Sequence, residues 1–355
     1  MQTPFVGRRR ELARLDGQLD EVEVRGGLLV LVSGPPGVGK SALVRQFIAG
    51  KGDLLVLEAT GAPGTDPPFG LLGRLFHQPC ADWSAVPGEA ITPADGSPAA
   101  GRRVLQTIAG LGQDRPVLLC IDDADRADEE SLRAILFALR RLARHPVLTV
   151  LITSSDSRRL PDGLVRLAEN GRTGIAVGVG PLRPADVREL AVAAGVPQLS
   201  LRTARRMCTH TGGNPRHLLA LLAELPIEDW PGDEELPAPL AVSRAVARAL
   251  NTCSEETRRL VEAVAVLGGQ AVLSVAADVA DVRDPLGALD GACAAGLLAK
   301  PRWEPMWFLT FADPLVHAAV RGQIGPAQSI RLRRAAAILG DHDSGEGSGF
   351  HPSPR

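Results

Sequence analysis

The chain has 355 residues, which suggests two or three domains, and its apolar content of 45% is ample for buried cores. A formal net charge of −2 gives no overall electrostatic case for binding nucleic acid or an anionic membrane. The sequence has no run of 18 apolar residues and no signal-peptide core, so we expect a cytoplasmic protein without membrane contact.

The first predicted element is an amphipathic helix within residues 1–27. It follows Phe5-Val6-Gly7-Arg8 and ends at Gly26-Gly27. Four apolar residues recur at helical spacing on one face, namely Leu12, Leu15, Leu19 and Val22. Taken alone, this is an ordinary amphipathic helix.

Residues 28–43, LLVLVSGPPGVGKSAL, predict a strand, a glycine-rich loop and the start of a helix. The apolar run 28–32 predicts a short buried strand, and residues 33–39 predict a turn. Lys40 then opens a helix with apolar periodicity. In this context, G-x-x-x-x-G-K-S is the pattern of a phosphate-binding loop.

The chemistry of phosphate binding explains this spacing. Gly34 and Gly39 allow consecutive backbone N–H groups to turn inward, and the following helix N-terminus adds positive potential. Lys40 should reach the β- and γ-phosphates, and the Ser41 hydroxyl should hold Mg²⁺. We therefore predict a nucleoside triphosphate site with the binding residues Gly34, Pro35, Pro36, Gly37, Val38, Gly39, Lys40, Ser41 and Ala42.

The use of lysine supports this interpretation. Of the 39 basic residues only three are lysines, at positions 40, 51 and 300. A chain that uses arginine almost everywhere else has a lysine where a slender point charge must enter the phosphate loop. A glycine-rich loop without a ligand is the alternative, and the lysine argues against it.

A second strong signal is the apolar run at residues 116–123, PVLLCIDD. It predicts a strand that ends in two acids, at the edge where open α/β sheets bind ligands. We predict that Asp122 holds Mg²⁺, directly or through water, and that Asp123 orients or deprotonates the attacking water. Taken alone, the pattern equally fits a strand followed by a solvated turn. Its position after a phosphate loop favours a catalytic set of Lys40, Asp122 and Asp123, with Ser41 and Asp122 as metal ligands.

The other elements of the first half surround these two motifs. Residues 54–58 predict a strand and residues 71–76 a helix, whereas residues 78–101 lack periodicity and predict a long surface excursion. Further segments predict a helix at 129–142 and strands at 147–153 and 174–179. Five strands that alternate with helices predict an α/β P-loop NTPase fold, a parallel sheet with helices on both faces.

Polar residues follow the predicted strand at 147–153. Thr153, Ser154 and Arg158 are candidates for sensing the γ-phosphate, because this strand tip should lie beside the acidic one.

After Gly180 the pattern predicts mainly helices. In TGGNPRHLL (211–219), glycines stop one helix and Asn-Pro starts the next, as in any helix–turn–helix corner. Short helices and an apolar strand at 307–311 predict a winged-helix-like α+β part. The predicted domains are a P-loop nucleotide-binding domain (1–180), a helical lid and linker (181–236), a winged-helix-like domain (237–322), a terminal helix (323–340) and a disordered tail (341–355).

Six motifs together make a more specific pattern: FVGRRREL, GPPGVGKS, LLCIDDADRAD, PLRPADVREL, TGGNPRHLL and ADPLVHAAV. They resemble the N-terminal ATPase module of the large ATP-binding LuxR-type regulators, which belong to the STAND group of signalling ATPases. The resemblance covers roughly residues 4–340. It implies that Val6 and Gly7 contact adenine, and that Gly213-Asn214-Pro215 is a lid motif with Pro215 near the base.

The chain departs from that family pattern in three places. Asp125 and Arg126 stand where the family usually has His and Trp. Asp313 stands where the family commonly has a histidine that touches the β-phosphate, and an anionic side chain cannot donate to phosphate. The family's long sensor and C-terminal helix-turn-helix do not follow in this sequence, so we expect a protein partner or an effector module that is missing from this sequence.

These observations favour an ATP-binding signalling switch with slow Mg²⁺-dependent hydrolysis, using ATP/ADP and Mg²⁺ as cofactors. One alternative is a DNA-binding transcriptional regulator that acts through residues 237–322. That segment is not strongly basic, so direct DNA binding is not favoured. The other alternative is a partner protein that binds nucleotide without hydrolysing it.

Overall fold

The computed structural model describes residues 4–62, 64, 67–76, 96–112, 115–142, 145–155, 159–225, 235–300 and 308–345. The chain divides into two compact units, Met1–Leu182 and Arg183–Arg355. Among the described residues, no helix is both long enough and apolar enough to cross a membrane.

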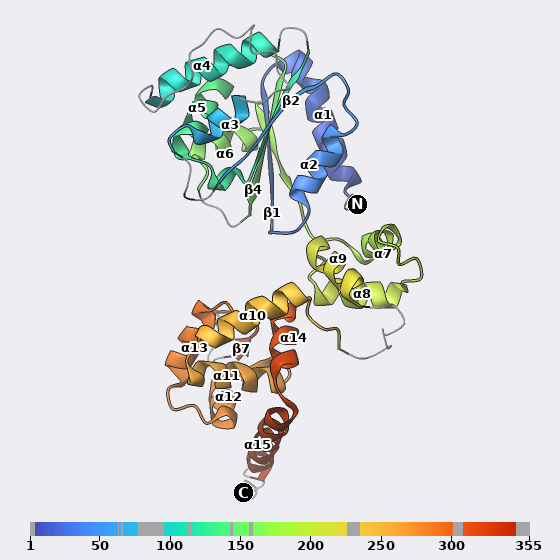
Figure 1. The fold of residues 1–355 in the computed structure, drawn as a ribbon, viewed down its shortest axis with the longest axis vertical. Coiled ribbons are helices and arrows are strands. Elements are labelled where there is room, and N and C mark those ends of the chain that lie inside the picture. Colours follow the sequence, from blue (N-terminus) through green and yellow to red (C-terminus); the bar gives the residue numbers. More distant parts are fainter. Residues whose placement is uncertain are drawn as a thin grey trace, which may run out of the picture. The chain divides into compact units, whose positions relative to one another are not determined.

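The first unit is built on a parallel sheet with the strand order β2-β3-β4-β1-β5 (Figure 1). Its strands are β1 (Leu28–Gly34), β2 (Leu55–Thr60), β3 (Val117–Asp122), β4 (Val147–Ser154) and β5 (Gly174–Gly178). β4 lies between β1 and β3, with Gly34 opposite Ser154 and Ile121 opposite Leu151. The carboxyl ends of β1, β3 and β4 therefore share one edge of the sheet, which is where α/β folds bind ligands.

Helices cover both faces of this sheet, as predicted. They are α1 (Arg9–Arg25), α2 (Lys40–Ile48), α3 (Gly70–Phe76), α4 (Gly96–Leu111), the short 3₁₀ turn η3 (Ala124–Arg126), α5 (Glu129–Leu139) and α6 (Asp162–Glu169). Figure 1 shows α1 and α2 on one face and α3 to α6 on the other. The chain thus has the predicted α/β fold of a P-loop NTPase.

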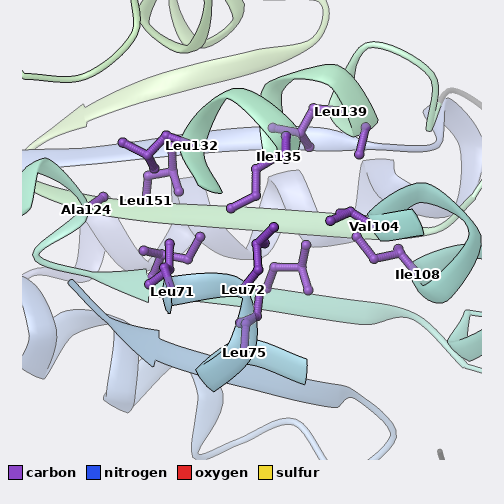
Figure 2. Packing of buried hydrophobic residues seen from close by; sticks show 14 of the residues in the cluster. Leu71, Leu72, Leu75, Val104, Ile108, Ala124, Leu132, Ile135, Leu139 and Leu151 are labelled. Carbon is purple, nitrogen blue, oxygen red and sulfur yellow. The ribbon is translucent and has the colours of Figure 1, made fainter. Parts of the chain in front are cut away.

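Successive side chains of a strand point to opposite faces of the sheet, so the first unit has a separate hydrophobic core on each face. On β1, Leu29 and Leu31 face the core under α3–α6, whereas Leu28, Val30 and Val32 face the core under α1 and α2. Figure 2 shows the first core, in which leucines of α3 and α5 meet side chains of α4 and Leu151 of β4. Strands buried on both faces read as continuous apolar runs, which is why their positions were predictable.

The second unit begins with three helices, α7 (Pro184–Ala193), α8 (Leu201–His210) and α9 (Pro215–Glu224). Further helices and one strand pair follow among the described residues: α10 (Leu240–Thr252), α11 (Glu255–Val266), β6 (Gln270–Val272), α12 (Leu273–Ala280), α13 (Pro285–Ala294), β7 (Phe308–Thr310), α14 (Pro314–Gln323) and α15 (Pro326–Gly345). β6 and β7 pair antiparallel, with Ala271 opposite Leu309. The predicted winged-helix-like α+β part is therefore present.

Two local motifs of this unit are helix caps. Asn214 Oδ1 accepts a hydrogen bond from the Arg216 N–H at 3.0 Å, at the start of α9. Asp313 Oδ1 accepts from the Leu315 N–H at 2.7 Å, at the start of α14. An acid at this position is favourable because it satisfies an orphan N–H group and complements the helix dipole.

The structure corrects the sequence-based expectations in three places. α4 begins at Gly96, within the predicted surface excursion, of which residues 78–95 lie outside the described part. α15 extends to Gly345, so residues 341–345 are helical rather than part of the predicted tail. Residues 346–355, and residues 226–234 of the predicted linker, lie outside the described residues. The strand β6 was not predicted, because three residues carry too little periodicity.

Two glycines in helices of the first unit should respond oppositely to Gly→Ala. A Cβ at Gly101 in α4 would lie 2.8 Å from Phe137 Cβ, which the α5 backbone holds in place, whereas a Cβ at Gly17 in α1 would meet nothing within 4 Å. Gly17→Ala should raise the free energy of unfolding by about 0.5–1 kcal/mol through helix propensity. Gly101→Ala should lower it by about 1 kcal/mol, because overpacking costs roughly 1–3 kcal/mol and exceeds that gain.

Urea unfolding monitored by circular dichroism measures both changes. Equal stabilisation by the two substitutions would contradict the close α4–α5 contact.

Candidate functional site

The loop between β1 and α2 has the backbone of a phosphate cradle. Gly37 and Gly39 have φ angles of 77° and 96°, in the left-handed region that side chains disfavour. A Cβ at Gly34 would lie 2.4 Å from the Val179 carbonyl oxygen, so only glycine fits there. The glycines of the motif are therefore needed for backbone geometry, independently of any ligand.

Backbone N–H groups at the start of α2 are available to an anion. The first helical hydrogen bond runs from the Leu43 N–H to the Gly39 carbonyl at 2.9 Å, so the N–H groups of residues 40–42 precede it. No side chain caps this helix end in the described part of the chain. Ser41 and Ala42 thus lie in a first turn whose positive end is open to a phosphate.

The Lys40 ammonium lies at the mouth of the loop. Its Nζ donates to the carbonyl oxygens of Gly34 at 2.9 Å and Pro35 at 3.0 Å. A phosphate oxygen is a stronger acceptor than a peptide carbonyl, so the ammonium can exchange these bonds for charged ones. This is the geometry that the assigned role of Lys40 needs.

The two acids end β3 in a strained turn. The Asp123 N–H donates to Asp122 Oδ1 at 3.0 Å, and Asp123 has φ 46° and ψ 44°. Left-handed backbone at a residue other than glycine costs about 1–3 kcal/mol and clusters at functional sites. The turn is fixed by the Gly61 N–H, which donates to the Asp122 carbonyl at 2.8 Å, and by the Arg126 N–H, which donates to the Asp123 carbonyl at 2.8 Å.

Asp123 also has a charged neighbour. Its Oδ2 lies 3.6 Å from Nη1 of Arg126, and both side chains are about half exposed. Asp125 and Arg126 stand where the resembled family usually has His and Trp. An ion pair at this place competes with water for the Asp123 carboxylate.

Cys120 lies two residues before the acids on β3 but has no chemical role there. Burial, with smaller contributions from Glu58 and Asp122, raises the pKa of its thiol to about 12. A thiol that stays protonated is neither a nucleophile nor a metal ligand.

The tip of β4 lies between the loop and the acids. The Thr153 side chain is buried, and its Oγ1 donates to the Ser154 carbonyl at 3.3 Å. The Ser155 N–H donates to the Gly34 carbonyl at 3.2 Å. Thr153 and Ser154 are thus placed beside the loop, whereas Arg158 lies outside the described residues.

The segment before α1 lies against the phosphate loop. Val6 and Gly7 are half-buried, and Gly7 and Arg8 have φ angles of 64° and 61°. Nη2 of Arg8 donates to the carbonyl oxygens of Val38 and Gly180. Arg8 was not among the predicted site residues, although the V-G-R pattern contains it.

Pro215, the remaining predicted nucleotide contact, belongs to the second unit. It is the first residue of α9 and follows the capping residue Asn214. This capping gives the Asn-Pro pair a local structural role. Its contact with the base stays a prediction.

The residues at the sheet edge fit a magnesium nucleotide. Mg²⁺ is usually held by one or two protein oxygens together with phosphates and water, rather than by a protein cage. The described residues hold no group of three or more His, Cys, Asp or Glu that could bind a metal. A Ser41 hydroxyl in the first turn of α2 and an Asp122 carboxylate at the end of β3 are the donor set that such an ion needs.

Comparison with known proteins agrees with this geometry. Residues 4–151 match the family model described as AAA ATPase domain. Domains of this family bind ATP or ADP with Mg²⁺. Among curated proteins, the comparison finds no match.

Two solved structures share the fold over most of the chain. The Walker-type ATPase PABY2304 of Pyrococcus abyssi has a TM-score of 0.51 at 16% identity, covering 89% of this chain and 96% of that chain. The Aeropyrum pernix ORC2 protein, in ADPNP–ADP complexes, has a TM-score of 0.51 at 14% identity, covering 94% and 95%. At such identities the likeness establishes the fold alone.

The close approach at Gly34 leads to a test of the loop. Gly34→Ala should destabilise the first unit by about 1–3 kcal/mol and weaken ATP binding, because the new Cβ displaces the Val179 backbone. Gly178→Ala is the matched control, since its Cβ would meet nothing within 4 Å. Thermal unfolding with and without ATP measures both effects, and an unchanged Gly34→Ala variant would contradict the tight loop geometry.

Proposed function

We propose that this chain is an ATP-binding signalling switch that hydrolyses ATP slowly with Mg²⁺. The observation that carries this proposal is the shared sheet edge. It combines an open helix N-terminus at Lys40 with two acids at the end of β3, one of them in a strained backbone conformation. Binding and positioning dominate phosphoryl transfer, so this arrangement supplies the main requirements.

Each residue has a distinct role in the proposal. The N–H groups of residues 37–42 bind the phosphates, and Lys40 neutralises the charge of the β- and γ-phosphates. Ser41 and Asp122 hold Mg²⁺, which when bound neutralises charge on the phosphate oxygens. Asp123 orients the attacking water and accepts its proton.

The N-terminal segment and the lid complete the proposed site. Val6 and Gly7 are proposed to contact the adenine, and Pro215 of the lid (181–236) is proposed to lie near the base. The lid and the winged-helix-like part (237–322) are proposed to respond to the nucleotide, as in the LuxR-type regulators that the motifs resemble. The downstream signal is proposed to pass to a protein partner.

Slow turnover follows from the neighbourhood of Asp123. The carboxylate must leave or share its ion pair with Arg126, 3.6 Å away, before it can orient water. An enzyme built for rapid turnover benefits from a base that is pre-organised toward its substrate. Slow hydrolysis lengthens the lifetime of the ATP-bound state, which suits a signalling switch.

ATP binding is tested by replacing Lys40. Lys40→Ala should weaken ATP binding by about 1.5–3 kcal/mol, roughly 10- to 150-fold in Kd, because a charge-assisted contact with phosphate is lost. Lys51→Ala is the control, since this lysine pairs with Asp16 at 2.9 Å after the end of α2. Isothermal titration calorimetry measures both, and equal ATP affinity of wild type and Lys40→Ala would refute the site.

Hydrolysis is tested separately at Asp123. Asp123→Asn should lower kcat by about 10²- to 10⁴-fold, as expected for loss of a general base, while ATP binding stays close to wild type. Asp125→Asn changes a neighbouring acid in the η3 turn and should leave turnover nearly unchanged. Phosphate release under single-turnover conditions measures this. Unchanged turnover in Asp123→Asn would favour a protein that binds nucleotide without using Asp123 as a base.

A further inference from the structure

We propose that Arg8 is a positioning residue that couples the phosphate loop to the segment leading into the second unit. This proposal rests on the proposed ATP-binding function. It adds the route by which nucleotide bound at the phosphate loop affects the end of the first unit. The route consists of hydrogen bonds within the first unit.

The Arg8 guanidinium joins two segments that are far apart in sequence. Its Nη2 donates to the Val38 carbonyl at 3.2 Å and to the Gly180 carbonyl at 2.5 Å. Nη1 donates to Oε1 of Glu11 at 3.3 Å, and the Arg8 side chain is only 9% exposed. Val38 belongs to the phosphate loop, and Gly180 lies just before the boundary between the units.

The bond to Val38 orients the loop peptide that should face phosphate. In a planar trans peptide the C=O and N–H groups point in opposite directions, and the described chain has no cis peptide bond. Holding the Val38 carbonyl toward Arg8 therefore turns the Gly39 N–H away from Arg8. Arg8 thus fixes the direction of an N–H group at the start of α2 without itself needing to touch the nucleotide.

The other end of the loop is tied to the same segment by the backbone. The Val179 N–H donates to the Ser33 carbonyl at 2.7 Å, and the Val179 carbonyl lies against Gly34. Leu182, the last residue of the first unit, is 4% exposed. Residues 179–180 are therefore held to the start of the loop by Val179 and to its end by Arg8.

Arginine suits this position better than lysine. A planar guanidinium presents several donors in a fixed fork and can hold two carbonyls and a carboxylate at once. The left-handed backbone of Gly7 and Arg8 and the nearby Glu11 set its direction. When bound phosphate orders the Val38–Gly39 peptide, the Arg8 guanidinium is held in place through its bond to the Val38 carbonyl. The Gly180 carbonyl, which accepts from the same guanidinium, is then held in place as well.

Hydrogen–deuterium exchange of the peptide covering residues 178–184 tests the coupling at saturating ATP. In the wild type, ATP should slow exchange of this peptide roughly threefold or more, because local opening becomes less frequent. Arg8→Lys should still bind ATP but lose most of this protection, since an ammonium cannot hold both carbonyls in a fixed geometry. Arg8→Ala should lose it entirely.

The matched control is Arg14→Ala. Arg14 lies on α1 and donates from Nη2 to the Ala176 carbonyl of β5 at 2.7 Å, so it also joins α1 to β5 but has no contact with the loop. Its replacement should leave the ATP-dependent protection as in the wild type. Circular dichroism confirms that each variant is folded.

Each outcome decides between distinct conclusions. Wild-type protection in a folded, ATP-bound Arg8→Lys variant would overturn the coupling role, as would wild type that binds ATP without protecting the peptide. A folded Arg8→Lys variant that no longer binds millimolar ATP would assign Arg8 to binding instead of coupling. Wild type that does not bind ATP would refute the proposed function itself, a result that calorimetry separates from the others.

Discussion

Parallel pairing of β4 with both β1 and β3 is the constraint on which the candidate site depends. This pairing brings three strand ends to one edge of the sheet, so that the glycine loop, the two acids and the polar tip of β4 meet there. Because β4 lies between β1 and β3, the polar carboxyl end of β4 separates the glycine loop from the two acids.

The two apolar cores allow the edge to hold strained backbone. Left-handed φ angles at Gly7, Arg8 and Asp123 and the close contact at Gly34 all occur within the candidate site of the first unit. At Arg8 and Asp123 this backbone is unfavourable in isolation, and it persists because the surrounding elements over-determine it. β1, β3 and β4 supply that rigidity, since each is buried on both faces.

In the second unit, Asp313 has a local structural role. Asp313 takes the place of a histidine in the resembled family, and here it caps α14. An acid is well suited to a helix N-terminus and poorly suited to phosphate. The resting state of the proposed switch therefore cannot depend on a hydrogen bond from this residue to phosphate.

The sequence alone determined the features that depend on local spacing. The strand–loop–helix around Lys40, the acidic end of β3 and the buried strands are encoded within short segments, because glycine conformations and apolar runs act locally. Local pattern could not predict α4, whose Gly/Ala-rich segment fits against Phe137 of α5, or β6, which exists only by pairing with β7. The strand order and the contacts of Arg8 with Val38 and Gly180 were likewise decided only by tertiary structure, since they join residues far apart in the chain.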